Sequence, residues 1–270
     1  MEKRALHYQN PSFGPDKAER CRLKVMVAPD GVSWMVKEEH GPVHVFDSWQ
    51  FAPTRTAQAL RKILQQDPLL TYPFSGQEVL FMMPATVCVP TRMFDAEAPA
   101  AYLNALTGQA FASVQHDYTK DGEQAVVSGF SAETEDIIRY FFPQCTTRLQ
   151  PAGLLDFWLQ ASPSESAAVF VHIRPSYIQV CGYERGNLLF FNTFKYEKPS
   201  DVLYFTLLVY DQLHLKPAND PLYVSGDLLQ EADIYRQYER FIRNIHFLQV
   251  KPLPGLPANM APHLYLDHQL

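Results

Sequence analysis

The feature that most constrains the fold of this chain is a hairpin pattern that occurs twice. Residues 25–36 read VMVAPDGVSWMV, and residues 169–180 read VFVHIRPSYIQV. Each stretch is an alternating apolar run, a turn and a second alternating run, which is typical of two antiparallel strands. Val169 follows Val25 by 144 positions, and Gly186 follows Gly41 by 145. This nearly constant offset predicts an internal duplication.

The first copy predicts a three-stranded antiparallel meander followed by a helix and a buried strand. The third strand begins at Val43, after a turn that contains Gly41. Apolar residues of TAQALRKILQQ then recur at helical spacing, with Thr54 or Thr56 as the expected N-cap. The run EVLFMMP is continuously apolar, which indicates a strand buried on both faces. A helical crossover would place this strand parallel to a neighbour.

The second copy repeats this order. LLFFNTFKY is the expected third strand, a helix is expected to open at Pro199 and Ser200, and PLYVSG is the expected buried strand. The segments between and after the copies add a strand over 124–131, helices over 133–142 and 148–160, and a last helix that leads into a strand near 245–250.

The length of 270 residues favours two domains or one double domain. The polar residues 1–19, with Pro and Gly, predict a flexible N-terminal arm. We expect the first half over 20–160 and the second half over 161–252. The Pro-rich residues 253–270 are expected to form a tail in which regular structure ends.

The duplicated order of elements resembles the ribonuclease-H-like fold of actin, Hsp70 and the sugar kinases. LKVMVAPDGVSWMV and LYVSGDLLQEADIYRQYERFIRNIHF carry a closer resemblance to the actin-like proteins of type IV pilus assembly, and to a bacterial family of unknown function that looks like a divergent member of that superfamily. The resemblance implies an α/β chain with two halves, each with a mixed sheet and flanking helices.

In active members of that superfamily, the first hairpin of each half presents an Asp that holds Mg²⁺ and a Gly that approaches phosphate. The matching positions here are Met26 and Ala28 in the first copy. In the second copy the first position is Phe170 or His172, followed by His172 or Arg174. Neither strand carries a carboxylate, so the resemblance implies neither ATP hydrolysis nor two-metal nuclease activity.

Two further stretches bear on nucleotide binding. Asp30 and Gly31 lie in the first turn, and turn chemistry accounts for them. The adenosine-binding signature of the superfamily has two adjacent glycines after the fourth strand of the second half. Here that place reads Ser225-Gly226-Asp227, with the second glycine replaced. A side chain there would crowd the base or ribose.

These observations favour a non-catalytic, pseudo-ATPase protein that binds another protein or a copy of itself and needs no cofactor or metal. The competing hypothesis is an ATP-binding switch or kinase with a rebuilt site, in which ATP and Mg²⁺ are disfavoured but possible ligands. A third, a peripheral component of envelope assembly, rests on fold analogy alone. Residues of a rebuilt site would be Asp30, Gly31, His172, Arg174, Ser225, Gly226 and Asp227.

Composition excludes several other classes. A net charge of −6 gives no basic face for nucleic acid. Four scattered cysteines without a CxxC pair indicate reduced thiols, and hence a cytoplasmic protein. The apolar run 202–210 is far shorter than the roughly 18 to 20 residues that span a bilayer. The pair His116-Asp117 and the tail histidines His263 and His268 are expected to have no site chemistry.

Overall fold

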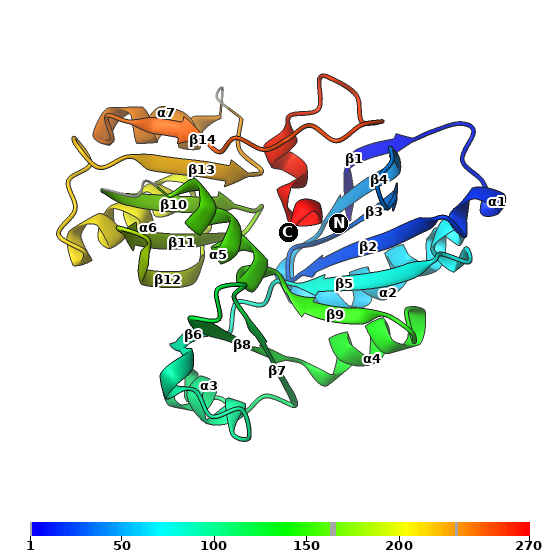
Figure 1. The fold of residues 1–270 in the computed structure, drawn as a ribbon, viewed down its shortest axis with the longest axis horizontal. Coiled ribbons are helices and arrows are strands. Elements are labelled where there is room, and N and C mark those ends of the chain that lie inside the picture. Colours follow the sequence, from blue (N-terminus) through cyan, green and yellow to red (C-terminus); the bar gives the residue numbers. More distant parts are fainter. Residues whose placement is uncertain (1, 163–165, 230–231) are drawn as a thin grey trace.

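A computed structural model describes residues 2–162, 166–229 and 232–270. The gaps fall on the first residue of the predicted arm, near the start of the second half and inside 222–247, so at those residues our predictions lie outside the described structure. The chain forms two α/β halves, and its C-terminal segment lies between them (Figure 1).

The first half is built on a six-stranded sheet in the order β1-β4-β3-β2-β5-β9. β2, β3 and β4 form the antiparallel meander, and β5 and β9 run parallel to β2. The strands are β1 (Lys3–Gln9), β2 (Cys21–Ala28), β3 (Gly31–Glu38), β4 (Val43–Gln50), β5 (Gly76–Phe81) and β9 (Thr146–Leu149). The helices are α1 (Pro15–Ala18), α2 (Thr56–Gln66), α4 (Ala132–Phe141) and α5 (Gln150–Ala161).

The second half is built on a five-stranded sheet in the order β12-β11-β10-β13-β14. Its meander is again antiparallel, and β13 lies parallel to β10. The strands are β10 (Ala167–Ile173), β11 (Tyr177–Glu184), β12 (Asn187–Lys195), β13 (Leu222–Gly226) and β14 (Ile245–Phe247), and the helices are α6 (Pro199–Gln212) and α7 (Asp233–Phe241).

The register confirms the duplication. Val25 pairs with Val79 across β2 and β5, and its equivalent Val169 pairs with Leu222 across β10 and β13. In each half the strand after the helix returns parallel to the first strand of the meander, as the crossover predicts. These central strands are buried along most of their length because helices cover the sheets.

A small third sheet, in the order β6-β8-β7, is inserted between β5 and α4. The pattern over 124–131 predicts β8 (Gln124–Phe130), but β6 (Thr86–Pro90), β7 (Ser113–Tyr118) and α3 (Pro99–Thr107) are not predicted. β7 reads SVQHDY, with no residue of it fully buried. A half-buried edge strand lacks the apolar alternation on which prediction depends.

The helix over 56–66 forms as expected, but its start differs from the prediction. Arg55 occupies the N-cap without a side-chain hydrogen bond, so neither Thr54 nor Thr56 caps the helix. The Thr56 hydroxyl instead donates to the carbonyls of Pro29 and Pro53, at 2.7 Å and 2.9 Å. This threonine therefore ties the helix start to the hairpin turn.

The predicted flexible arm over 1–19 is wrong for most of its length. Lys3–Gln9 forms edge strand β1, antiparallel to β4. Arg4 hydrogen-bonds the fully buried carboxylate of Asp47 and lies over the Trp49 ring. A polar edge strand gives a weak sequence signal, because only one of its faces meets the core.

The C-terminal tail does not end regular structure. Its last residues form the 3-10 helix η4 (Pro262–Gln269), which buries Tyr265, Leu266, Asp267 and His268. Leu266 joins a core cluster with residues of both halves, and Tyr265 packs with Phe46 on β4. A short turn of helix after a Pro-rich stretch has too few apolar residues to show periodicity.

Among the described residues, no helix is both long enough and apolar enough to cross a bilayer.

Candidate functional site

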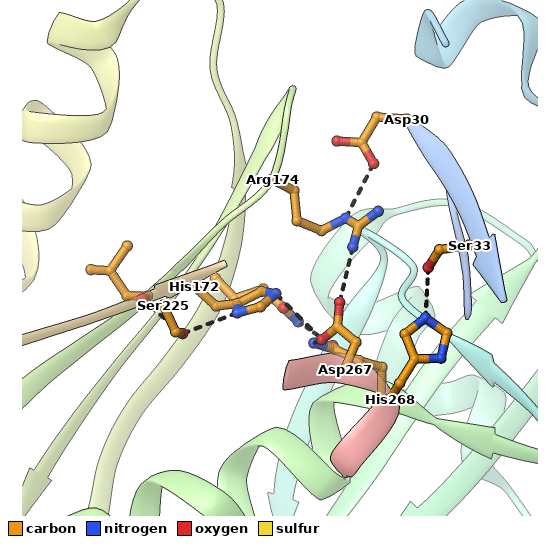
Figure 2. Close-up of polar contacts among 10 residues, drawn as sticks. Asp30, Ser33, His172, Arg174, Ser225, Asp267 and His268 are labelled. Atoms are coloured by element: carbon orange, nitrogen blue, oxygen red, sulfur yellow. Dashed lines mark hydrogen bonds and ion pairs between the residues drawn. The ribbon is translucent and has the colours of Figure 1, made fainter. Parts of the chain in front are cut away.

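The turns of the two duplicated hairpins contact each other across the cleft between the halves (Figure 2). Asp30 lies in the turn after β2, and Arg174 lies in the turn after β10. The Arg174 Nε donates to Asp30 Oδ1 at 3.2 Å, and the Ser176 backbone N–H donates to Asp30 Oδ2 at 2.9 Å. One buried carboxylate of the first half is therefore held by a turn of the second.

The C-terminal segment adds a second carboxylate to this contact. Asp267 of η4 accepts a hydrogen bond from Arg174 Nη1 at 3.1 Å and one from Gln150 Nε2 at 2.9 Å. His172 Nε2 lies 3.3 Å from the other side of the same carboxylate, at Oδ1. Arg174 thus bridges Asp30 and Asp267, and it is only 12% exposed.

The polar network continues into the sheet of the second half and into helix α5. His172 Nδ1 lies 3.0 Å from Ser225 Oγ, across the paired strands β10 and β13. The Gln179 amide donates to Gln150 Oε1 at 2.9 Å. All four of these side chains are buried, so the network replaces the hydrogen bonds that water would otherwise provide.

Charges in this network shift the pKa values of its members. Burial opposes the charge on Arg174, but the carboxylates of Asp30, Asp267 and Asp227 outweigh burial and raise its pKa. Burial likewise opposes the charge on Asp267, but His172 and Arg174, together with the hydrogen bond from Gln150, lower its pKa well below the usual range. Arg174 and Asp267 are therefore both charged at neutral pH and form an ion pair.

His268 anchors η4 on the other side of the cleft. Its Nε2 lies 2.8 Å from Ser33 Oγ on β3, and its ring packs edge-to-face with Phe46, with the ring centroids 5.4 Å apart. Burial, opposed by Asp267 and reinforced by the charges of Lys24 and Arg174, lowers the pKa of His268 to about 3. The imidazole is therefore neutral in the folded chain at neutral pH.

This lowered pKa predicts an acid-dependent loss of stability. Between about pH 6.5 and pH 3 the unfolded chain binds a proton at His268 that the folded chain does not, so the free energy of unfolding falls as pH falls. From pH 7 to pH 5, the free energy of unfolding of the wild type should fall by about 2 kcal/mol more than that of His268→Gln. Urea unfolding of both proteins at each pH checks this, and parallel pH profiles would contradict it.

The place where a Mg²⁺-binding acid is expected is apolar. Met26 packs with Ala28, Leu80 and Met82 of the first half and with Tyr177 of the second half. Met26 and Ala28 are completely buried. A thioether and methyl groups are poor ligands for a hard cation, so these residues do not fit Mg²⁺.

Little space remains in the cleft beside the network. A cavity of about 20 Å³ lies between β3, β4, β10 and η4, lined in part by His172, Arg174, Gly226, Asp227 and Asp267. A cavity of this size has room for one water molecule. The C-terminal segment therefore occupies the space that a ligand between the two hairpins would need.

Backbone packing explains the retained glycine of the Ser225-Gly226-Asp227 stretch. Gly226 has φ of +85°, and a Cβ on it would lie 2.1 Å from the Ile173 carbonyl oxygen. The Asp227 N–H donates to the same carbonyl at 2.7 Å. Gly226 is thus required by the close approach of β13 to β10, without any ligand.

Ser225, His172 and Asp267 follow one another in the order of a hydrolytic triad, with Ser225 Oγ and Asp267 on opposite nitrogens of the imidazole. Ser225 is fully buried, and the cavity nearby cannot hold a substrate carbonyl. A nucleophile needs an accessible position for the atom that it attacks. In this closed arrangement the three residues link the halves and supply no accessible nucleophile.

Four of the seven residues singled out from the sequence enter this network: Asp30, His172, Arg174 and Ser225. The turn explanation of Asp30 is incomplete, because its side chain pairs across the cleft. A Cβ on Gly31 would lie 2.6 Å from the Trp49 carbonyl oxygen, so close packing requires this glycine. Asp227 makes no side-chain hydrogen bond or ion pair with any described residue.

Sequence reasoning missed the partners of these residues, namely Gln150, Gln179, Asp267, His268 and Ser33. The one sequence signal for η4 is weak: Leu264 and Leu266 flank Tyr265 in an otherwise polar tail. His263 Nε2 donates to the Leu228 carbonyl at 2.8 Å, which gives this histidine a structural role in packing the tail. Asp117 accepts from the Leu149 N–H at 2.7 Å, so it has a structural partner.

The sequence profile of a family described as a protein of unknown function (DUF3822) matches residues 10–245. A search of curated protein sequences gives no match.

Solved structures share the fold. A Bacteroides thetaiotaomicron protein with an actin-like ATPase fold and unknown function superposes with a TM-score of 0.81 at 17% identity, covering 95% of this chain and 97% of that one. The PilM-PilN type IV pilus biogenesis complex superposes with a TM-score of 0.51 at 13% identity, covering 84% of this chain and 88% of that one. The ethanolamine utilization protein EutJ of Carboxydothermus hydrogenoformans superposes with a TM-score of 0.50 at 9% identity, covering 96% of this chain and 89% of that one. The predicted actin-like fold is thereby confirmed.

Proposed function

The chain belongs to the DUF3822 family of proteins of unknown function, and from this premise we propose that it is a non-catalytic actin-like protein that acts by binding another protein or a second copy of itself. We place it in the cytoplasm, where its four free cysteines would remain reduced.

The observation that carries this proposal is the occupied cleft. The carboxylate of Asp267 lies where the hairpins of the two halves converge, and Arg174, His172 and Gln150 already bind it. A nucleotide would have to displace a segment that buries Leu266 completely and pairs two charges. Met26 also occupies the position where an acid would hold Mg²⁺, which supports a role without phosphoryl transfer.

A protein partner is supported by the surface of the inserted sheet and its helix. Met93, Leu106 and Tyr118 are 67%, 68% and 41% exposed, and all three lie on this small unit. Tyr118 belongs to an aromatic group with Phe94 and His116, whose ring centroids lie 5.1 to 6.0 Å apart. Exposed aromatic and aliphatic side chains gathered on one unit are typical of protein interaction sites.

The neighbour PilM is solved in complex with PilN, a second protein, which is consistent with this type of role for the fold. By this analogy of fold, the partner would belong to an assembly of the cell envelope. The competing hypothesis, an ATP-binding switch, requires the C-terminal segment to leave the cleft. Detachment of that segment by Leu266→Ala separates the two hypotheses.

Capture from the native host tests the proposal. We expect the wild type to retain a defined partner, or a second copy, equally well with and without Mg-ATP. Leu106→Asp should weaken this association at least about tenfold, because it places a charge in the apolar surface. The matched control is Tyr204→Asp, which changes a side chain 61% exposed on α6, in the other half.

Loss of the partner on addition of Mg-ATP would favour the switch instead. Equal loss in both variants would place the interaction elsewhere on the molecule. Sedimentation of the purified chain distinguishes self-association from capture of another protein.

A further inference from the structure

A second group of reactive side chains lies at the far end of the first sheet, away from the cleft. Cys21 begins β2, Glu38 ends β3, and His44 lies near the start of β4. Cys21 and Glu38 are directly paired across the two strands. One thiol sulfur, one carboxylate oxygen and one imidazole nitrogen all lie within 4.8 Å of one another.

Neighbouring residues hold the imidazole in place. Phe13 stacks on the His44 ring with a centroid distance of 5.2 Å and an interplanar angle of 18°. The Asn10 amide lies 3.5 Å from Nδ1, and the Asn10 N–H donates to the His44 carbonyl at 2.7 Å. The Nε2 atom faces Glu38 Oε1 at 3.0 Å. The stacking and the backbone hydrogen bond hold the imidazole with Nε2 toward the carboxylate.

The tight turn after β3 leaves room for the carboxylate. A Cβ on Gly41 would lie 2.5 Å from Glu38 Oε2, so a side chain at that position would push the carboxylate away from His44. The Glu38 side chain is 43% exposed, whereas Cys21 is completely buried and His44 is 5% exposed. The group is therefore closed on the protein side and open to solvent on the Glu38 side.

We propose that Cys21, Glu38 and His44 bind one zinc-class divalent cation, with water at the fourth position. Thiolate, imidazole and carboxylate are the ligands that Zn²⁺ takes, at about 2.0 to 2.3 Å in tetrahedral geometry. A cation between the three atoms needs only a small movement of the partly exposed Glu38 carboxylate. On binding, the thiol releases its proton, the imidazole proton moves from Nε2 to Nδ1, and the cation replaces the hydrogen bond between His44 and Glu38. The site clamps three adjacent strands of the meander together.

Cobalt(II) is the probe, since it takes the same geometry and its spectrum reports thiolate ligation. Full-length protein, prepared with chelator and then freed of it, is titrated with Co²⁺. We expect saturation at one equivalent, with a near-ultraviolet thiolate-to-cobalt band and the visible bands of four-coordinate cobalt. Added Zn²⁺ should displace the cobalt and raise the melting temperature.

Matched variants make the result specific. Cys21→Ser should remove the charge-transfer band, whereas Cys145→Ser, which changes a half-buried cysteine outside the group, should keep it. Glu38→Gln alters a side chain near the surface and should fold normally, with cobalt affinity lowered at least about tenfold. Absence of the band in the wild type, or its persistence in Cys21→Ser, would overturn the proposal.

Discussion

Replacement of Arg174 by alanine is expected to lower the free energy of unfolding by about 3 to 5 kcal/mol. Arg174 is the only residue among those described that bonds both Asp30 and Asp267, and both carboxylates are buried. Without the guanidinium, Asp30 keeps the Ser176 N–H, and Asp267 keeps Gln150 and His172. Two negative charges would then remain in the cleft with no arginine between them, which is costly.

Urea unfolding at pH 7 measures this effect. The control is Arg148→Ala, whose side chain is 35% exposed and lies 3.8 Å from Asp117, so its loss should cost less than about 1 kcal/mol. Arg174→Lys keeps the charge but cannot reach both carboxylates with a planar fork, and should fall between the two. A change below about 1 kcal/mol for Arg174→Ala would mean that the cleft contact does not hold the halves together.

Leu266→Ala is expected to detach the C-terminal segment, at a cost of about 2 to 5 kcal/mol. Leu266 is fully buried in a core cluster that contains residues of both halves, and it holds η4 in the position from which Asp267 reaches Arg174. Amide hydrogen exchange should show lost protection over 262–270 before the central strands are affected. Leu106→Ala, at a residue 68% exposed, should change stability by less than about 0.5 kcal/mol.

The same variant separates the two functional hypotheses. A ligand at 100 times its dissociation constant adds about 2.7 kcal/mol to the stability of a protein that binds it only when folded. We expect neither the wild type nor Leu266→Ala to gain melting temperature with Mg-ATP, because Met26 still stands where the acid is needed. A gain in Leu266→Ala alone would identify a nucleotide site that the C-terminal segment covers, and would reject the non-catalytic proposal.

These experiments bear on one physical idea. The duplicated fold brings its two hairpin turns together, and a nucleotide would normally lie between such turns in the superfamily that the sequence resembles. In this chain, oppositely charged side chains of the turns bond each other, and the chain's own carboxylate completes the contact. The halves are thereby joined through side chains of the chain itself.

Much of the fold could be predicted from local patterns. Alternation over 25–36 and 169–180 predicted both hairpins, and the apolar runs near 80 and 223 predicted the parallel strands β5 and β13. These elements are buried on at least one face, so the spacing of their apolar residues follows strand or helix geometry. Edge strand β1, the half-buried β7 and the four-residue β9 carry no such periodicity, and they were missed.

The candidate site was predictable only in part. Residue types at the hairpins indicated that the acid of an active ATPase is missing, and the structure places apolar packing around Met26. The pairing of Asp30 with Arg174 could have been suspected, since the two residues occupy equivalent turns of the duplication. The part played by Asp267 could not, because nothing in a Pro-rich tail indicates which cleft its last turn will enter.

The sequence by itself determined the duplication, the two meanders and the loss of the superfamily's acids, because each depends on residues close together in the chain or on direct comparison of two copies. Only the tertiary structure decided that the cleft is closed. That closure depends on residues 93 to 144 positions apart, Arg174 with Asp267 and Asp30 with Arg174. A charge in a turn satisfies local geometry equally well with water or with a partner, so only the packing of the halves and of η4 selects the partner.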